Sequence, residues 1–166
     1  MIIVLLFVFI KSSNGSDRPF NQVVLSENNN IGNTALPTFY DTILSVGLDE
    51  VGIQFQSVSI SKLSDGAKSQ FDGQLKAHLR YFGNFFYLFI DDMDKEEAIT
   101  VISHEIIHIQ QYLNQDLIYE EDQLIWKGEE IDLNSKEYER RPWEIEAFDR
   151  EGDLASRVTK KLWGDN

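Results

Sequence analysis

One stretch of the chain, residues 94–113, carries the strongest pattern and reads DKEEAITVISHEIIHIQQYL. At its centre stands an HExxH motif, His104-Glu105-Ile106-Ile107-His108. Two histidines four residues apart on a helix project from the same side, one turn from each other. That separation lets both imidazoles bind one Zn²⁺, so the motif predicts a zinc site, provided that the stretch is helical.

The sequence of this stretch favours a helix. Asp94 is a suitable N-cap, and Glu97 follows three residues later, as in a capping box. Glu96 and Glu97 suit the positive end of the helix dipole, and neither Pro nor Gly interrupts the run before Asn114. We therefore expect one helix from Asp94 to Leu113.

The position of the two histidines on this helix suits a site that is largely buried but can still contact a substrate. At about 100° per residue, one arc of the helix is apolar, and His104 and His108 fall at the edge of that arc. Glu97 and Gln111 lie on the histidine side, so either can fix which imidazole nitrogen is protonated. The alternative is that both histidines are ordinary solvated residues of an amphipathic helix. The apolar arc consists of Ala98, Val101, Ile102, Ile106, Ile109, Tyr112 and Leu113.

A zinc site needs a third protein ligand, with the fourth position left to water. The best context lies in segment 138–148, YERRPWEIEAF, where Pro142 suits the first position of a helix that runs to about Leu162. On that helix Glu144 falls in the middle of the apolar arc, whereas Glu146 points about 200° away, toward solvent. A carboxylate buried alone costs several kcal/mol, and a metal would be a suitable partner. Glu144 is therefore the preferred third ligand.

Other acidic residues stay open as the third ligand, namely Glu139, Glu146 and Glu151. Glu151 also lies on the inward arc, so it can instead support a ligand from behind. Glu144 itself can simply favour the helix dipole from the first turn, and this role is compatible with metal binding.

The two motifs together resemble a known family. An HExxH motif with a later Pro142-Trp143-Glu144-Ile145-Glu146-Ala147 is similar to the gluzincin branch of the zincin metallopeptidases, in particular to small bacterial and phage metallopeptidases that pair HExxH with an ExEA helix. The resemblance covers roughly residues 96–150. It departs from the longer family pattern, because the position four residues after Glu144 is Phe148 rather than Asp, and Asp149 is one residue away.

This resemblance implies a function. It implies a compact zincin-like domain and a zinc-dependent hydrolase that cleaves peptide bonds in peptide or protein substrates. Zn²⁺ would be held by His104, His108 and Glu144, and Glu105 would act as general base on a water activated by the metal. An alternative from another class is a zinc-stabilised binding or structural module, of phage or envelope origin, that cleaves nothing.

Further catalytic candidates precede Glu144. Tyr138, Arg140 and Arg141 stand where a phenol or a guanidinium can stabilise an oxyanion. Among them we assign this role to Tyr138. The alternative is that all three form ordinary surface pairs.

The beginning of the chain is an apolar run, MIIVLLFVFI at 1–10, followed by KSSNGS at 11–16. Ten apolar residues are too few to span a bilayer but match the core of a secretory signal peptide, with small residues near Gly15 or Ser16 for cleavage. The sequence thus predicts a signal peptide over residues 1–16 and an exported protein, periplasmic or secreted. The alternative is a buried first strand of a cytoplasmic domain.

Composition limits both the ligands and the partners. The chain of 166 residues contains no Cys, which leaves nitrogen and oxygen as metal ligands and excludes a disulfide framework. A formal net charge of −13 argues against nucleic acid as a partner, because phosphate binding needs a basic stripe. Residues 17–166 are long enough for one domain with one hydrophobic core.

The fold that we expect is α+β, with a small mixed or antiparallel sheet packed against the HExxH helix and the C-terminal helix. Patterns of apolar residues, Gly and Pro predict the remaining elements. They are a helix from Pro37 to Gly47, one or two strands within Val51–Leu63, a helix over Ala67–Leu79, a strand over Phe85–Ile90 and a hairpin over Asp122–Leu133.

Three of these predictions bear on function. In zincins, the strand before the active helix lies along the cleft and can receive a peptide by edge pairing, so the resemblance implies this use for Phe85–Ile90. The alternative is a central core strand. The hairpin would cap the cleft or carry substrate contacts. His78 is a lone histidine, and we expect it to be a surface or core residue rather than a ligand.

Overall fold

The structure is a computed structural model, and the residues that it describes are 36–54, 57–69, 75–82, 85–120, 123–132 and 140–164. The predicted signal peptide over residues 1–16 lies outside these ranges, as do Tyr138 and Glu139. Among the described residues, helices and strands both occur, and the two sheets have three strands each. The prediction of an α+β fold is confirmed.

Contacts divide the described residues into two compact units. One unit contains residues 36–42 and 53–98, and the other contains residues 43–52 and 99–164. The boundary crosses two helices, α1 (Phe39–Glu50) and α3 (Lys95–Leu113). The prediction of one domain over residues 17–166 stays a prediction.

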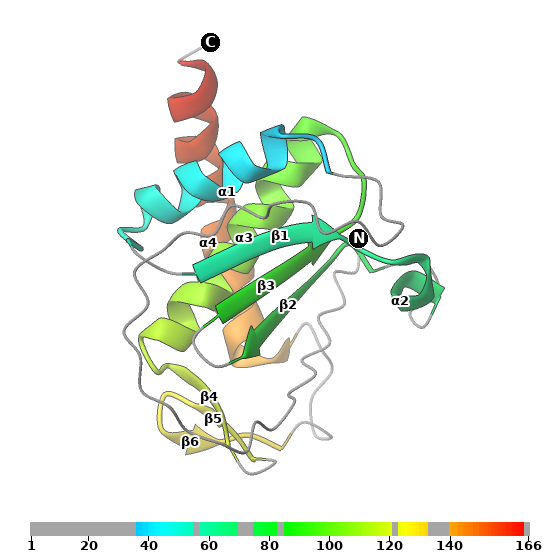
Figure 1. Cartoon of the computed structure of the whole chain (residues 1–166). Helices are drawn as coiled ribbons and strands as arrows, with labels where there is room; N and C mark the ends of the chain where they lie inside the picture. Colours follow the sequence, from blue (N-terminus) through cyan, green and yellow to red (C-terminus); the bar gives the residue numbers. More distant parts are fainter. Residues whose placement is uncertain are drawn as a thin grey trace. The chain divides into compact units, whose positions relative to one another are not determined.

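The sheet of the first unit is mixed. Its strands are β1 (Ser57–Lys62), β2 (Ala77–Phe82) and β3 (Phe85–Ile90), in the order β1-β3-β2 (Figure 1). β1 runs parallel to β3, and β2 runs antiparallel to it. The strand predicted over Phe85–Ile90 is confirmed. Because both edges of β3 are paired, its predicted use for edge pairing with a peptide is wrong, and the alternative of a core strand holds.

The helix predicted over Ala67–Leu79 is wrong. A short helix, α2, covers Asp65–Ser69, and β2 begins at Ala77. Leu75 and Leu79 are four residues apart, which suits a helix, but Ala77 between them is also fully buried. Three buried side chains at alternate positions are the pattern of a strand, so the period of two was the correct one.

Helix α1 also differs from its prediction, because it continues through Gly47 and ends at Glu50. The turn that follows contains Gly52 with φ of 73°, a conformation that favours glycine. Gly47 is a close approach rather than a helix end, since a Cβ there would lie 2.4 Å from Cδ1 of Ile106. The missing side chain lets the second half of α1 approach α3.

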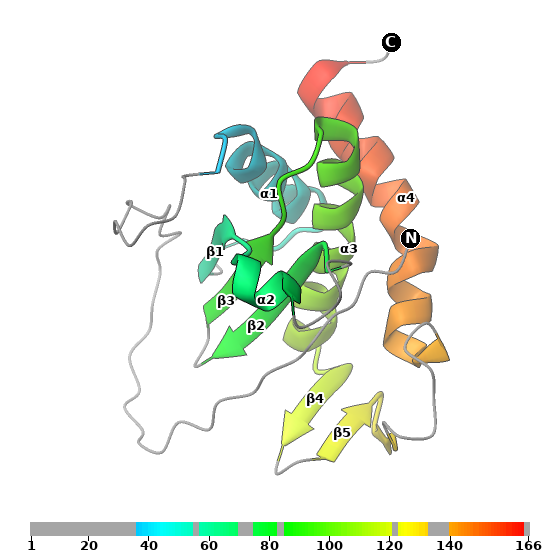
Figure 2. The same cartoon turned by 90° about the vertical axis from the view of Figure 1, so that its right-hand side faces the viewer.

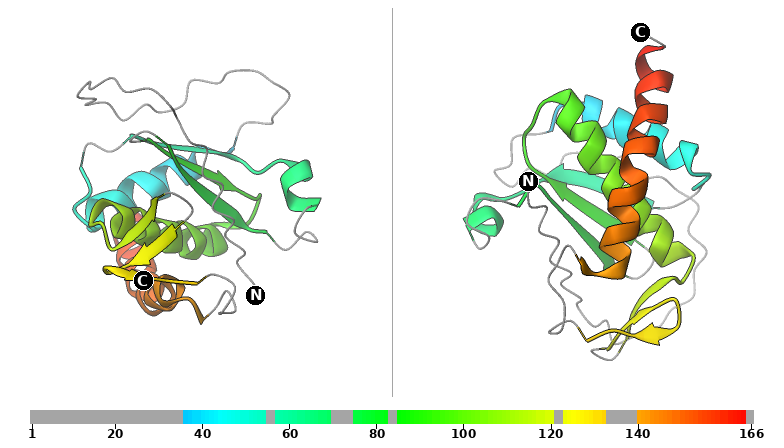
Figure 3. Two further views of the ribbon diagram at one scale, coloured as in Figure 1. Left: turned by 90° about the horizontal axis from the view of Figure 1, so that it is seen from below. Right: turned by 180° about the vertical axis from the view of Figure 1, so that it is seen from behind.

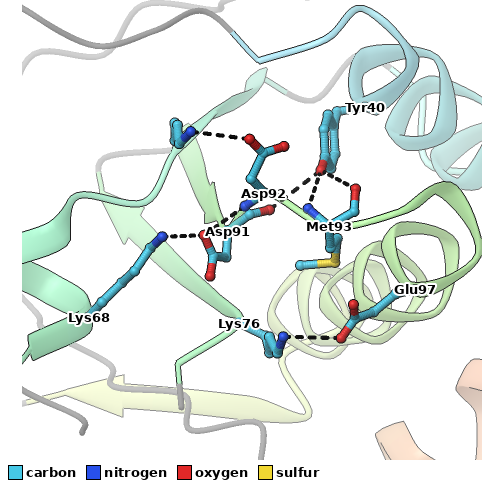
Figure 4. Close-up of polar contacts among 8 residues, drawn as sticks. Tyr40, Lys68, Lys76, Asp91, Asp92, Met93 and Glu97 are labelled. Atoms are coloured by element: carbon cyan, nitrogen blue, oxygen red, sulfur yellow. Dashed lines mark hydrogen bonds and ion pairs between the residues drawn. The ribbon is translucent and has the colours of Figure 1, made fainter. Parts of the chain in front are cut away.

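A polar cluster fixes the segment that connects β3 to α3 (Figure 4). The buried hydroxyl of Tyr40 accepts a hydrogen bond from the backbone N of Met93 at 2.9 Å and lies 3.0 Å from its carbonyl O. Lys68 pairs with Asp91. The segment before α3 is therefore anchored by side chains from α1 and α2.

The start of α3 is as predicted. Oδ1 of Asp94 accepts a hydrogen bond from the backbone N of Glu97 at 2.9 Å, so Asp94 is the N-cap. The carboxylate of Glu97 lies 3.3 Å from Nζ of Lys76, which makes it an ion-pair partner there.

None of the described helices is long and apolar enough to cross a membrane.

The second unit combines two long helices with a small antiparallel sheet (Figure 2). The sheet contains β4 (Leu117–Glu120), β5 (Gln123–Trp126) and β6 (Glu129–Glu130), in that order. The predicted hairpin is confirmed as β5 and β6, with positive φ at Lys127 (49°) and Gly128 (85°), as a two-residue hairpin turn requires. β4 was not predicted, and Leu133 lies outside the described residues.

Helix α4 spans Pro142–Trp163 and lies beside α3 (Figure 3). Pro142 occupies the first turn, as the sequence predicts. The face of α4 toward the core carries Trp143, Glu144, Ala147, Leu154 and Val158, all buried. A carboxylate is therefore part of an otherwise apolar face.

Candidate metal centre

Three buried side chains converge between α3 and α4. Nε2 of His104 and Nε2 of His108 lie 3.0 Å apart. Oε2 of Glu144 lies 3.3 Å from the first and 3.4 Å from the second. Donors bound to one tetrahedral Zn²⁺ at about 2.0–2.1 Å are about 3.3–3.4 Å from each other, so these three atoms have the spacing of a shared metal ion.

The two helices bring these groups together for local reasons. His104 and His108 are one turn apart on α3 and so point the same way. Pro142 starts α4 abruptly, and Glu144 follows in its first turn. Because the neighbouring Trp143 is fully buried, this turn is held against the core, and the Glu144 carboxylate is buried with it.

Hydrogen bonds at the far side of each ring determine its tautomer. Nδ1 of His104 lies 2.7 Å from Oε2 of Glu151, and Nδ1 of His108 lies 2.8 Å from Oε1 of Gln111. The amide of Gln111 is itself oriented, because its Nε2 donates to the carbonyl O of Trp143 at 3.0 Å. Carboxylate and amide oxygens only accept, so each Nδ1 donates.

In neutral rings, this leaves a lone pair on each Nε2. Two lone-pair nitrogens and a carboxylate oxygen then lie within 3.4 Å of one another, away from solvent. Three acceptors so close repel each other unless a cation lies among them. The residues present therefore fit a divalent metal held by two imidazoles and one carboxylate.

The charges around His104 agree with this arrangement. Burial lowers the pKa of His104, but the carboxylates of Glu144 and Glu151 together outweigh it and leave the pKa raised. In the metal-free protein, the cluster thus attracts a proton. A metal must displace that proton, which couples metal affinity to pH.

Glu105 stands directly after His104 and is fully buried. Neither of its carboxylate oxygens has a hydrogen-bond partner among the described residues. Burial raises the pKa of Glu105 to about 8, and the charge of Glu144 adds to the rise, while His108 opposes it. A carboxyl group with a pKa in this range can both accept and return a proton near neutral pH.

Several predicted candidates lie elsewhere. Glu146 forms ion pairs with Lys127 and Arg150. Glu97 was a candidate for an imidazole partner but pairs with Lys76 instead. Tyr138, the oxyanion candidate, and Glu139 lie outside the described residues.

His78 is a buried residue of β2, as one of the two alternatives predicted. Its ring lies beside that of Phe89, with 6.1 Å between the centroids. His78 is thus a core histidine of the first unit.

Two residues near the cluster were not singled out from the sequence. The ring of Phe148 packs on that of His104, with 4.8 Å between the centroids. Tyr112 follows His108 by one turn, and its pKa is raised well above the usual value, first by burial and then by the charge of Glu144. The spacing of His104, His108 and Tyr112, four residues each, was the signal for a row on one face of α3.

The acid that orients His104 is Glu151, which the sequence offered as a residue that supports a ligand. The resemblance places such an acid four residues after Glu144, where this chain has Phe148. Glu151 follows Glu144 by seven residues, which is two helical turns and therefore the same face. The inward direction of Glu151 on the helical wheel was the signal that pointed to it.

The centre is closed as well as compact. His104, Glu105, His108 and Glu144 each have 0% of their surface exposed.

Comparison with protein-family models, curated proteins and solved structures gave no match.

Proposed function

We propose that the protein is a zinc-dependent peptidase of the gluzincin type that its two motifs resemble. The observation that carries this proposal is the convergence of His104, His108 and Glu144, with Glu105 buried directly beside a proposed ligand. The substrate would be a peptide or a protein.

Each residue has a separate task in this proposal. His104, His108 and Glu144 would hold Zn²⁺, while Glu151 and Gln111 keep the ring protons on Nδ1 and so direct both lone pairs at the ion. When bound, Zn²⁺ polarises a carbonyl and lowers the pKa of a water molecule from about 15.7 toward 7. Glu105 takes the proton of the attacking water and returns it to the leaving amine.

The test compares two substitutions. Glu105→Gln should keep full zinc content and lose about 10²–10⁴-fold in peptide hydrolysis, because the proton acceptor is gone. His104→Ala should lose both zinc and hydrolysis. Zinc content is measured by elemental analysis after dialysis, and hydrolysis with a mixed peptide library. Full zinc and full hydrolysis in both variants would contradict the proposal.

The complete burial of the cluster supports a second candidate, a zinc-stabilised structural or binding module. Structural zinc sites are closed, whereas catalytic sites keep a position open to substrate. If the protein is such a module, zinc should stabilise the fold. The wild type and Glu105→Gln should then hydrolyse every peptide at the same rate. If Zn²⁺ neither binds nor stabilises the wild type, both candidates fail.

A further inference from the structure

Two hydrogen bonds join α4 to neighbouring residues of α3. In each, the residue of α4 directly precedes an acidic residue of the metal centre. The carbonyl O of Trp143 accepts a hydrogen bond from Gln111 at 3.0 Å, and Glu144 comes next. The guanidinium of Arg150 donates to Oε1 of Gln110, and Glu151 comes next. Trp143 and Arg150 are seven residues apart, so both lie on one face of α4.

Arg150 has a second fixed contact. Its Nη1 donates to Oε1 of Glu146 at 2.9 Å, one turn earlier on α4. The other carboxylate oxygen of Glu146 accepts from Nζ of Lys127, in the turn between β5 and β6, at 2.7 Å. The planar guanidinium is thus held at both ends, by Gln110 of α3 and by Glu146 of α4.

As ion pairs, these contacts add little to the free energy of unfolding. The Arg150 side chain is 41% exposed, and that of Lys127 is 51% exposed. Ion pairs of this exposure contribute little to the free energy of unfolding. What they can determine is the position of α4 along α3, because a slide of one residue moves a helix by about 1.5 Å.

The centre is sensitive to such a slide. Oε2 of Glu151 lies 2.7 Å from Nδ1 of His104, and a shift of 1.5 Å would break this hydrogen bond. Either ring nitrogen of His104 could then carry the proton. In the molecules with the proton on Nε2, that atom would have no lone pair for a metal. Glu144, on the same helix, would shift with Glu151.

We propose that Arg150 is a positioning residue for the metal centre. By binding Gln110 and Glu146, it holds α4 at the register in which Glu151 orients His104 and Glu144 reaches both imidazoles. This inference rests on the proposed metal site and assigns to it a residue that touches none of the three proposed ligands.

The test is zinc affinity, with a matched control on the same helix. Arg157 also pairs with a residue four positions earlier, Asp153 at 3.3 Å, and also reaches another helix, where it donates to the carbonyl O of Glu50 at 3.1 Å. Its side chain is 44% exposed. Arg150→Met should bind Zn²⁺ about 10–100-fold more weakly than wild type, whereas Arg157→Met should bind as wild type does. Affinity is measured by competition with a chromophoric chelator.

Variants of Gln110 separate positioning from a general loss of structure. Gln110→Glu keeps an acceptor for Arg150 and should keep the affinity, whereas Gln110→Leu should lose as much as Arg150→Met. The double variant Arg150→Met with Gln110→Leu should bind no more weakly than either single variant, because both break the same contact. Visible absorption of the Co²⁺-loaded protein should lose its tetrahedral intensity in the same variants.

A second measurement needs no metal. At a pH above the pKa of His104, nitrogen-15 spectra of the imidazoles should show the ring proton of His104 on Nδ1 in the metal-free wild type and in Arg157→Met, and a mixture of tautomers in Arg150→Met. Arg150 has no positioning role if Arg150→Met matches wild type in affinity and spectra, or if Arg157→Met weakens binding equally. If the wild type binds neither Zn²⁺ nor Co²⁺, the proposed function fails as well, and this distinguishes the two failures.

Discussion

The carboxylate of Glu144 lies 3.3 Å from Nε2 of His104, although 40 positions separate the two residues in sequence. Both side chains are fully buried. A carboxylate and an imidazole at this distance, with the second imidazole of His108 also in reach, can share a proton or a divalent metal.

Removal of the carboxylate should remove most of the metal affinity. Glu144→Gln keeps the size of the side chain but replaces an anionic ligand with a neutral amide, so Zn²⁺ affinity should fall at least 10–100-fold. Asp149→Asn makes the same change of charge at an exposed position of α4 and should bind Zn²⁺ as wild type does. Isothermal titration of the metal-free proteins measures both. Equal affinities in the two variants would exclude Glu144 as a ligand.

Zinc should stabilise the fold, and less so in acid. A metal that binds only the folded protein at 100-fold above its dissociation constant adds about 2.7 kcal/mol to the free energy of unfolding. The raised pKa of His104 means that protons compete with the metal as the pH falls through that pKa. The rise in Tm on addition of Zn²⁺ should therefore be larger at pH 7.5 than at pH 5.5. A Tm that Zn²⁺ does not change at either pH would support a metal-free protein.

The buried carboxyl of Glu105 should make the metal-free protein less stable as the pH rises. Its pKa is raised to about 8, chiefly by burial, whereas a Glu in an unfolded chain titrates near 4.3. Between these values the folded protein holds more protons than the unfolded chain, so the free energy of unfolding decreases with rising pH and levels off above about 8. The loss is on the order of a few kcal/mol.

Urea unfolding in the presence of a chelator, at pH 5.5 and pH 8.5, measures this loss. Glu105→Gln cannot titrate, so its free energy of unfolding should decrease less than that of wild type over the same interval. The same decrease in both proteins would show that the pKa of Glu105 is not raised.

The close approach at Gly47 should make it sensitive to a single methyl group. A Cβ at Gly47 would lie 2.4 Å from Cδ1 of Ile106, so Gly47→Ala should cost about 1–3 kcal/mol of unfolding free energy through overpacking. That cost exceeds or cancels the gain of about 1 kcal/mol in helix propensity. Ile106→Val lacks the clashing methyl and should recover part of the loss in the double variant.

Gly152 provides the control. It lies in α4, and apart from the backbone of that helix no atom of the described residues lies within 4 Å of an added Cβ, so Gly152→Ala should stabilise the protein by about 0.5–1 kcal/mol. Chemical denaturation measures all four variants. Stabilisation by Gly47→Ala equal to that by Gly152→Ala would contradict the close contact.

Local signals in the sequence predicted the elements that carry the centre. Asp94 marks the start of α3, Pro142 marks the start of α4, and the residues at Lys127-Gly128 form the hairpin turn, because each of these effects acts within a few residues. The prediction failed over Ala67–Leu79, where the spacing of Leu75 and Leu79 suits both a helix and a strand. Only pairing with β3 distinguishes the two.

By itself, the sequence determined that two histidines share a face of one helix and that one acid lies on the apolar face of a later helix. Helical periodicity is sufficient for this, because it fixes the direction of a side chain within its own helix. Tertiary structure decided which atoms meet across the two helices: Glu151 contacts His104, the carbonyl O of Trp143 contacts Gln111, and Arg150 contacts Gln110. These contacts depend on the rotation and register of α4 against α3, which are set by packing between the two helices. The helical wheel of α4 indicated that Glu151 points inward, but not which ring it meets.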